Sequence, residues 1–294
     1  EICACLVGSE MCIRDRAVQA RAELIMLSDI AGYVGADTCG CLLAIRQDQQ
    51  EEISLMIDIG TNGEMVLGNR ERMVTCSTAA GPAFEGAKIE CGMRGAAGAV
   101  DHVKYEDGKW NYTTVGNKPA VGLCGSGLID LVAGLLDAGM LDENGVLRSG
   151  QEKQGVFILV PPERGGNERG VYLTQKDLGE VQLAKAAIAA GIQMLMERLG
   201  ITEDDICSVY IAGAFGNYMD PVSAGKIGLL PATLVKKVKP VGNAAGEGAK
   251  IALVNEKEML EMDELVRKIE FVELAASADF QDHFIDELGF ETGE

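Results

Sequence analysis

The segment that most constrains the fold of this 294-residue chain is 56–67, where two apolar runs flank a Gly-Thr-Asn-Gly turn. Apolar runs of this length are typical of strands, and an Asn-Gly turn between them predicts a β-hairpin. The first run, 53–59, holds a single acid, Asp58, next to its end. Backbone N–H groups and a hydroxyl at a glycine-rich tip can surround phosphate oxygens, and a nearby carboxylate can hold Mg²⁺ through water. A hairpin that only reverses the chain is the competing interpretation.

Two more glycine motifs follow this hairpin. In 121–130 a short apolar segment enters a Gly-Ser-Gly turn at 125–127, and a helix leaves it. The N-terminus of a helix offers unpaired N–H groups and a partial positive charge, which bind anions. In 209–217 a buried strand ends in Gly-Ala-Phe-Gly, where the backbone can approach a base or a ribose. Each motif alone is also explained by a tight turn, whereas the three in this order favour a nucleotide site.

The rest of the pattern predicts an α/β chain with short connections. Three successive short strands within 53–76 predict an antiparallel meander. Thr174 and Asp177 form a capping-box pattern at the start of a long helix, 175–199. The remaining expected elements are a strand at 23–27, a helix beginning near Pro82, a hairpin formed by 98–105 and 109–115, helices at 125–139, 243–254, 257–267 and 280–288, a buried strand at 209–212 and a strand at 269–274.

The charge of the chain argues against several functions. The sequence holds 45 acidic and 26 basic residues, a formal net charge of −19, and its densest basic group is Lys236, Lys237 and Lys239. A nucleic-acid partner needs a basic patch, so none is expected. No apolar stretch approaches the roughly 20 residues of a membrane helix, so no membrane partner is expected either. The first residues lack the basic and apolar parts of a signal peptide, so we expect a cytoplasmic location.

The nine cysteines contain no Cys-x-x-Cys pair, and most of them lie in apolar or glycine-rich runs. Buried, reduced thiols are therefore expected rather than disulfides or a cluster. With only His102 and His283 available, a His-rich metal site is not expected.

The order of the three glycine motifs resembles that of the sugar kinase, heat-shock chaperone and actin superfamily, in which a first phosphate motif, a second phosphate motif and an adenosine motif follow one another. A closer resemblance, over 21–290, is to the C-terminal ATP-binding domain of the reductive activators of corrinoid proteins. The resemblance implies an α/β chain with the two-lobed, actin-like ATPase (ASKHA) fold and a nucleotide cleft between the lobes. The stretches that carry it are 29–37, 57–64, 76–86, 91–94, 124–130 and 211–216.

The resemblance also implies a division of the chain. Residues 17–117 would form the first lobe with the phosphate-1 hairpin, and 118–240 the second lobe with the phosphate-2 and adenosine motifs. Residues 241–294 would form a return segment and a C-terminal helix. Residues 1–16 match nothing downstream and look like translated sequencing-adapter sequence, so we exclude them from the fold.

The implied activity is ATP-dependent reduction of an inactive Co(II) corrinoid to Co(I), with ATP and Mg²⁺ as cofactors. The implied partner is a corrinoid methyl-transfer protein, and a homodimer stays open. Such activators carry an N-terminal plant-type [2Fe-2S] domain, but Cys3, Cys5 and Cys12 lack its Cys-x₄-Cys-x₂-Cys spacing. The [2Fe-2S] cluster is therefore expected only in an N-terminal domain missing from this chain.

Site residues carry over motif by motif. Asp58 would be the catalytic residue and would hold Mg²⁺ through water. The β- and γ-phosphates would contact the hairpin tip, at Gly60, Thr61, Asn62, Gly63 and, as a weaker candidate, Glu64. The other side of the phosphates would meet Gly125, Ser126 and Gly127, and the nucleoside would meet Gly213, Ala214, Phe215 and Gly216. The cleft or the partner face would include Thr78, Gly81, Glu85 and Arg94.

Three other functions stay open at this point. A small-molecule kinase of the same superfamily would need a carboxylate base and a polar substrate pocket. A related activator ATPase with a [4Fe-4S] cluster between subunits would need thiol ligands, for which Cys91 and Cys124 are the plausible pair. A nucleotide-switched binding module would bind ATP with negligible turnover.

Overall fold

The computed structural model describes residues 27–148 and 155–290, and its main sheet has six strands. These strands are β1 (Ile53–Ile59), β2 (Gly63–Gly68), β3 (Met73–Thr78), β9 (Ile206–Ala212), β10 (Val238–Gly242) and β11 (Glu270–Phe271). Their order across the sheet is β10-β9-β1-β2-β3-β11. The first three form the predicted antiparallel meander, whereas β9, β10 and β11 each pair in parallel with a neighbour.

The pairing of β1 with β9 brings two glycine motifs together. Both strands are apolar along most of their length, as expected of parallel strands that are covered on both faces. In the register of the pair Ile57 lies beside Ile211, and Asp58 lies beside Ala212. The end of β1 that carries Asp58 therefore meets the end of β9, where the third glycine motif begins.

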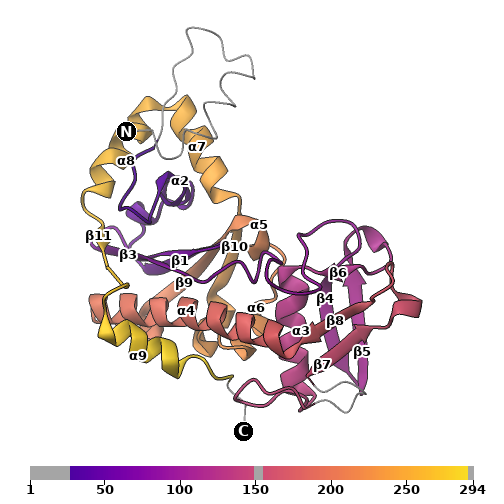
Figure 1. Cartoon of the computed structure of the whole chain (residues 1–294). Helices are drawn as coiled ribbons and strands as arrows, with labels where there is room; N and C mark the ends of the chain where they lie inside the picture. The colour runs from indigo at the N-terminus through magenta and orange to yellow at the C-terminus, as the bar shows by residue number, and fades with distance from the viewer. Residues whose placement is uncertain (1–26, 149–154, 291–294) are drawn as a thin grey trace.

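Helices cover both faces of the main sheet (Figure 1). One face is covered by α2 (Ala36–Ile45), α7 (Ala244–Val254) and α8 (Glu256–Val266), and the other by α4 (Gln175–Leu199) and α9 (Ala278–Asp286). Successive side chains of β1 point to opposite faces of the sheet and pack into two hydrophobic cores. Met56 packs on the side of α2 and α7, whereas Leu55 and Ile57 pack on the side of α4. The sheet is therefore the buried middle layer of a three-layer body.

A second, smaller part of the molecule holds a three-stranded and a two-stranded sheet (Figure 1). Its elements are β4 (Ala99–Glu106), β5 (Lys109–Thr114), β6 (Gly122–Leu123), α3 (Gly125–Asp137), β7 (Val156–Val160) and β8 (Val171–Thr174). The helix α3 packs on β4, and Thr174 at the end of β8 caps α4. The long helix α4 thus starts in the smaller part and runs beneath the main sheet.

The segments on both sides of residue 117 contribute strands or helices to the main sheet and to the smaller part alike. The segment 17–117 supplies β1, β2 and β3 to the main sheet, but it also supplies β4 and β5 to the smaller part. The segment 118–240 supplies β9 and β10 to the main sheet and α3 to the smaller part. The physical reason is the parallel pairing of β9 with β1, a contact between residues far apart in sequence, which no local pattern reveals.

Most predicted elements are confirmed, including the 53–68 hairpin, the hairpin turned at 106–108, the helix α3 and the Thr174–Asp177 capping box. The helix expected near Pro82 is wrong, because 82–86 is a series of turns. The helix α2 was not predicted, since Gly40 reads as a break. Gly40 is needed there because a Cβ atom would lie 2.7 Å from the Ala245 carbonyl oxygen of α7. The expectations for 1–16 and for most of 23–27 fall outside the described residues.

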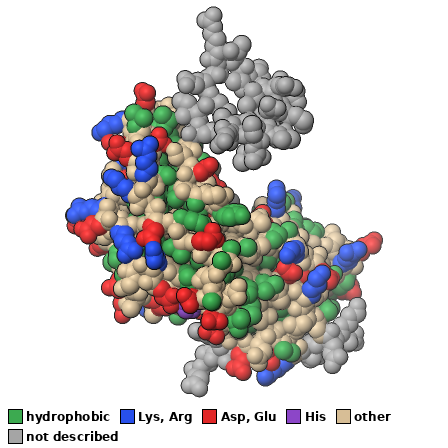
Figure 2. Space-filling model, turned by 60° about the vertical axis from the view of Figure 1, so that its left-hand side comes forward, with side chains coloured by type: hydrophobic (Ala, Val, Ile, Leu, Met, Phe, Trp, Pro, Cys, Tyr) green, Lys and Arg blue, Asp and Glu red, His purple; other side chains and the backbone are tan. Residues whose placement is uncertain are grey.

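The surface carries many charges of both signs. On the face shown in Figure 2, Lys and Arg side chains are interspersed with Asp and Glu rather than gathered in one basic patch. Within the described ranges, no helix has both the length and the apolarity that crossing a membrane requires. Of the cysteines in these ranges, Cys39, Cys41, Cys76 and Cys124 are buried free thiols, as predicted, whereas Cys207 is exposed.

Candidate active site

The tip of the β1–β2 hairpin is held by its own backbone and by the loop that follows β3. The Gly60 N–H donates to the Asn62 carbonyl at 2.9 Å, and the Gly81 N–H donates to the Thr61 carbonyl at 2.8 Å. Gly63 allows the hairpin to pack on α4, because a Cβ atom would lie 3.2 Å from Ile188. The side chains of Thr61 and Asn62 remain exposed at the tip. The tip is therefore ordered by packing, while its polar groups face outward.

Asp58 lies where the first and third glycine motifs meet. A Cβ atom on Gly213 would lie 3.0 Å from Asp58 Oδ1, and Gly213 has a φ of +84°, which favours glycine. Asp58 Oδ2 accepts a hydrogen bond from the Cys41 thiol at 3.9 Å. Burial, and then the charge of Asp37, raise the pKa of the Asp58 carboxyl, while the Cys41 hydrogen bond lowers it.

Glu64 stands opposite Asp58 on the neighbouring strand. Its pKa is raised mainly by burial, with smaller contributions from Asp37 and Asp58, and is lowered by the Ser77 hydroxyl, which donates at 3.2 Å. Asp37 lies in the first turn of α2 and acts on both carboxyls. Asp37 and Cys41 belong to the helix that the sequence did not predict, so neither was a candidate.

These carboxyls fit a magnesium ion bound mostly through water and phosphate. Among the described residues, no group of three or more His, Cys, Asp or Glu side chains is placed to hold a metal by itself. Mg²⁺ keeps several waters and takes one or two carboxylates together with substrate phosphates. A cation beside Asp58 would also relieve the raised pKa of that carboxyl. The donor set therefore suits a hydrated Mg²⁺ better than a metal caged by protein ligands.

The second glycine motif forms the N-terminus of α3 and is closely packed. A Cβ atom on Gly125 would lie 2.1 Å from the Phe84 carbonyl oxygen, and one on Gly127 would lie 2.2 Å from the Val100 carbonyl oxygen. The buried Ser126 hydroxyl donates to the Asp101 carbonyl at 2.8 Å. The glycines have a packing role, and an anion here would meet the free backbone N–H groups of the helix rather than the Ser126 proton.

Phe84 and Phe215 connect the second and third motifs. Their rings stack with centroids 5.7 Å apart and an angle of 16° between the planes. A Cβ atom on Gly125 would lie 2.7 Å from the Phe215 ring, so the N-terminus of α3 touches both residues of the pair. Phe215 belongs to the short helix α5 (Gly213–Gly216), which also contains Ala214, and Gly216 packs against Ile211. The second and third motifs therefore meet at this ring pair, while the first meets the third where Asp58 approaches Gly213, although all three are distant in sequence.

A cavity of about 480 Å³ opens where the second and third motifs meet, at the junction of the main-sheet body and the smaller part. The predicted hairpin residues 58 and 60–64 are not among its lining residues. Its charged side chains are Glu85, Arg94 and Asp101, and within the described ranges Arg94 forms no ion pair. Of the predicted cleft residues, Glu85 and Arg94 line the cavity, whereas Thr78 is buried below the hairpin and donates to the Gly63 carbonyl at 3.3 Å. The full lining is Phe84, Glu85, Met93, Arg94, Gly95, Asp101, Val115, Gly116, Cys124, Gly125, Ser126, Phe215 and Tyr218.

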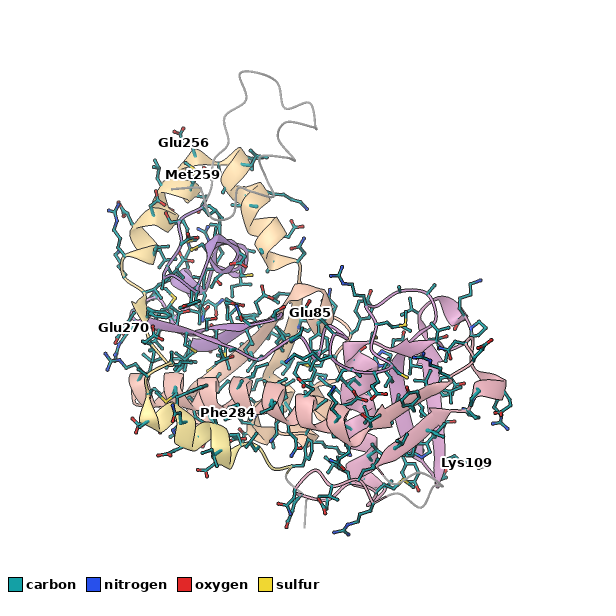
Figure 3. All side chains as sticks on the ribbon, in the orientation of Figure 1. Glu85, Lys109, Glu256, Met259, Glu270 and Phe284 are labelled. Atoms are coloured by element: carbon teal, nitrogen blue, oxygen red, sulfur yellow. The ribbon has the colours of Figure 1, made fainter. Side chains whose placement is uncertain are left out.

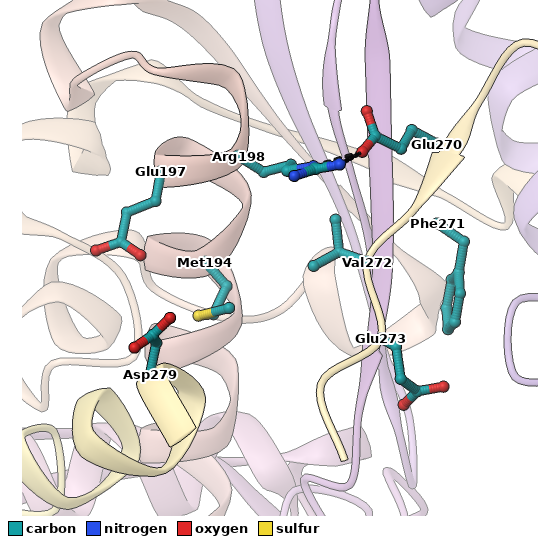
Figure 4. A pocket seen from close by; sticks show the side chains of 8 residues that line it. All are labelled: Met194, Glu197, Arg198, Glu270, Phe271, Val272, Glu273 and Asp279. Carbon is teal, nitrogen blue, oxygen red and sulfur yellow. Dashed lines mark hydrogen bonds and ion pairs between the residues drawn. The ribbon is translucent and has the colours of Figure 1, made fainter. Parts of the chain in front are cut away.

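Other hollows lie away from the glycine motifs. One of about 400 Å³ lies between α4, β11 and α9, where Arg198 forms an ion pair with Glu270 near Met194 and Asp279 (Figure 4). It contains no predicted site residue. The thiols proposed for a shared cluster also have partners, because the Cys124 thiol donates to the Val100 carbonyl at 3.3 Å and Cys91 contacts the Gly170 carbonyl at 4.0 Å.

The main sheet combines an antiparallel hairpin with parallel strands, and glycine motifs lie at the ends of β1 and β9 and at the start of α3, as expected of the ASKHA fold. Residues 52–294 match the family described as the C-terminal domain of RACo, the ASKHA domain, and the chain belongs to this family. The resemblance to the ATP-binding domain of the reductive activators is thereby confirmed.

Curated relatives and a solved structure agree with this assignment. The chain is 38% identical over 283 residues to the corrinoid activation enzyme RamQ of Eubacterium limosum, covering 91% of this chain and 47% of the relative. It is 29% identical over 297 residues to the "[Co(II) methylated amine-specific corrinoid protein] reductase" of Methanosarcina barkeri, covering 93% of this chain and 52% of the relative. The structure of a reductive activator for corrinoid, iron-sulfur protein superposes with a TM-score of 0.84 at 40% identity, covering 90% of this chain and 44% of that one. The chain thus spans about half the length of the curated relatives it matches.

Proposed function

We propose that this chain is the ATP-binding and ATP-hydrolysing part of a reductive activator, which drives the reduction of a Co(II) corrinoid protein to Co(I). The observation that carries the proposal is that the third glycine motif meets both of the others, the first at Asp58 and Gly213 and the second at Phe215 and Gly125. The second of these contacts lies beside one cavity. The printed names of two relatives, a corrinoid activation enzyme and a Co(II) corrinoid protein reductase, support the choice of substrate. The electron would come from a [2Fe-2S] domain outside this chain.

The roles of the residues follow from their positions. The hairpin tip, 60–63, with its exposed Thr61 and Asn62, and the N-terminus of α3 would hold the phosphates from two sides, because both present backbone N–H groups. Phe215 and the turn that contains it would meet the nucleoside. Asp58 would orient the waters of the metal, with Glu64 next to it. When bound, Mg²⁺ would neutralise charge on the transferred phosphoryl group.

ATP can favour reduction only if the nucleotide binds two conformations of the complex with different affinity. The cavity lies between the main-sheet body and the smaller part, so a bound nucleotide would contact both. Closing or opening this junction would change the surface that a corrinoid protein meets. We propose that the partner binds in a nucleotide-dependent way. A cytoplasmic location stays a prediction of the sequence, and a homodimer stays open.

The direct test is ATP hydrolysis by the purified chain with and without a cognate Co(II) corrinoid protein. We expect Mg²⁺-dependent hydrolysis that the Co(II) partner increases and that an unrelated cobalt-free protein of similar charge does not. Phosphorylation of a small molecule in place of hydrolysis would instead indicate a kinase. Nucleotide binding without any turnover would indicate a binding module.

A further inference from the structure

Glu85 makes a contact that the nucleotide roles above do not use. Its carboxylate Oε1 accepts a hydrogen bond from the Thr61 hydroxyl, with 2.6 Å between the two oxygens. Both side chains are exposed, and Glu85 also lines the cavity. Figure 3 shows Glu85 where the main-sheet body and the smaller part meet. Glu85, in the loop after β3, therefore accepts the hydrogen bond of Thr61, which carries the only hydroxyl at the hairpin tip 60–63.

The backbone of the same loop holds the same residue. The Gly81 N–H donates to the Thr61 carbonyl at 2.8 Å, and Gly81 has a φ of +76°, which favours glycine. The loop 79–86 thus forms hydrogen bonds with two groups of Thr61, its carbonyl and its hydroxyl. The first contact fixes the backbone of the tip, and the second determines where the hydroxyl proton points.

The contact with Glu85 competes with phosphate binding. A threonine hydroxyl has one proton to donate, so Thr61 cannot donate to Glu85 and to a phosphate oxygen at the same time. The carboxylate and the phosphate also carry charges of the same sign, which repel when they are only a few ångströms apart. A phosphate group at the tip would therefore have to displace Glu85 from Thr61.

We propose that Glu85 is an autoinhibitory latch, which holds the Thr61 hydroxyl in the nucleotide-free chain and releases it when a nucleoside polyphosphate binds. The inference rests on the proposed function, since it takes the phosphates of ATP as the ligand. The residues described above favour nucleotide binding, and the latch is a regulatory contact that opposes it.

Release of the latch can change the contacts of the other two glycine motifs through Phe84, the residue next to Glu85. Phe84 stacks on Phe215, and its carbonyl oxygen would lie 2.1 Å from a Cβ atom on Gly125. A shift of the loop that frees Glu85 would therefore alter the contacts of Phe84 with α5 and with the N-terminus of α3. The latch connects phosphate occupancy at the hairpin with the junction between the two parts of the molecule.

The test compares MgATP binding by the wild type, Glu85→Gln and Glu71→Gln, measured by calorimetry. Glu85→Gln keeps the shape of the side chain and removes its charge, and we expect it to bind MgATP about 10-fold more tightly, because hydrogen bonds to charged groups are the stronger ones. Glu71 is exposed in the turn between β2 and β3, at the opposite end of β2, so Glu71→Gln removes the same charge far from the tip. It should stay within about 2-fold of the wild type, because salt screens distant surface charges.

A second measurement tests the contact without nucleotide. In a double-mutant cycle on chemical unfolding, Thr61→Val and Glu85→Ala should be non-additive, because each substitution alone removes the one hydrogen bond between the two side chains. Strict additivity would overturn the latch, as would unchanged affinity of Glu85→Gln for MgATP or an equal gain in Glu71→Gln. Failure of all three proteins to bind MgATP would overturn the proposed function and the latch with it, whereas normal binding by the wild type without a gain in Glu85→Gln would overturn the latch alone.

Discussion

At the residue scale, Asp58 stands in surroundings that oppose its own charge. Burial and Asp37 raise the pKa of its carboxyl, and Glu64 lies opposite on the next strand. The Cys41 thiol, 3.9 Å from Oδ2, is a weak donor and offsets little of this. A buried carboxylate next to other acids destabilises the nucleotide-free fold but creates a strong preference for a cation. Stability and magnesium binding should therefore change in opposite directions when Asp58 is neutralised.

Asp58→Asn should stabilise the nucleotide-free protein near neutral pH by about 0.5–2 kcal/mol, the common range for a single stabilising substitution. The same variant should lose most of the Mg²⁺-dependent rise in melting temperature that ATP causes, whereas in the wild type a ligand at 100 times its Kd adds about 2.7 kcal/mol. Urea unfolding measures the first effect, and thermal unfolding with MgATP against ATP and EDTA measures the second. A less stable variant that keeps the full magnesium effect would contradict this role for Asp58.

The raised pKa values of Asp58 and Glu64 also predict a pH dependence. The folded chain binds these protons more tightly than the unfolded chain, in which carboxyls titrate near about 4. Their contribution to stability is therefore fully present below about pH 4 and is lost as the pH rises through the raised folded values. The stability difference between Asp58→Asn and the wild type should be small in acid and should grow toward neutral pH. If the stability difference between Asp58→Asn and the wild type stays constant across this pH range, Asp58 is not the titrating group.

At the scale of elements, the sequence predicts what depends on neighbouring residues. Thr174 and Asp177 lie three apart, so their capping box can be recognised from sequence alone, and the structure confirms it. The helix α2 could not be predicted, because Gly40 lies inside it only to let α7 approach. The three glycine motifs were recognisable in the same local way. Their contacts at Asp58 and Gly213, and at Phe215 and Gly125, were not recognisable, since they join segments that are distant in sequence.

The capping box of α4 forms a further hydrogen bond with a distant segment, which the local sequence does not show. Asp177 Oδ2 accepts from Thr174, and Oδ1 accepts from the Glu90 N–H at 2.9 Å, so the buried carboxylate also fixes the loop that contains Glu90. Asp177→Ala should cost about 2–5 kcal/mol, because it removes a cap of about 0.5–2 kcal/mol and a hydrogen bond to a charged group of about 1.5–3 kcal/mol. Asp205 forms the same box with Thr202 on the surface and provides a matched control.

Chemical unfolding of Asp177→Ala and Asp205→Ala decides whether the contact with Glu90 matters. Asp205→Ala should lose less than half as much stability as Asp177→Ala, because it removes a cap without a second bond to a distant segment. Equal losses would mean that the hydrogen bond to the Glu90 N–H contributes nothing beyond the cap.

At the scale of the whole molecule, the main-sheet body and the smaller part share one long helix and one cavity. The helix α4 begins beside β8 and runs under the main sheet (Figure 1), while the cavity is lined from both sides by Phe84, Phe215 and the start of α3. A ligand in this cavity can stabilise one relative arrangement of the two parts over another. The arrangement is the property through which a nucleotide could influence a protein partner.

The last prediction follows from this arrangement. If ATP favours one form of the junction and a Co(II) corrinoid protein binds the same form, each should tighten the binding of the other by about 5–150-fold, a coupling of about 1–3 kcal/mol. Reciprocity lets the coupling be measured from either side, and binding requires no electron donor. Calorimetric titration of a cognate corrinoid protein, with and without a non-hydrolysable ATP analogue, gives the two affinities. Asp58→Asn should reduce the coupling, because it weakens the magnesium-dependent part of nucleotide binding. Equal affinities with and without nucleotide, together with hydrolysis that the partner does not stimulate, would refute the corrinoid-activating function and favour a kinase or a binding module.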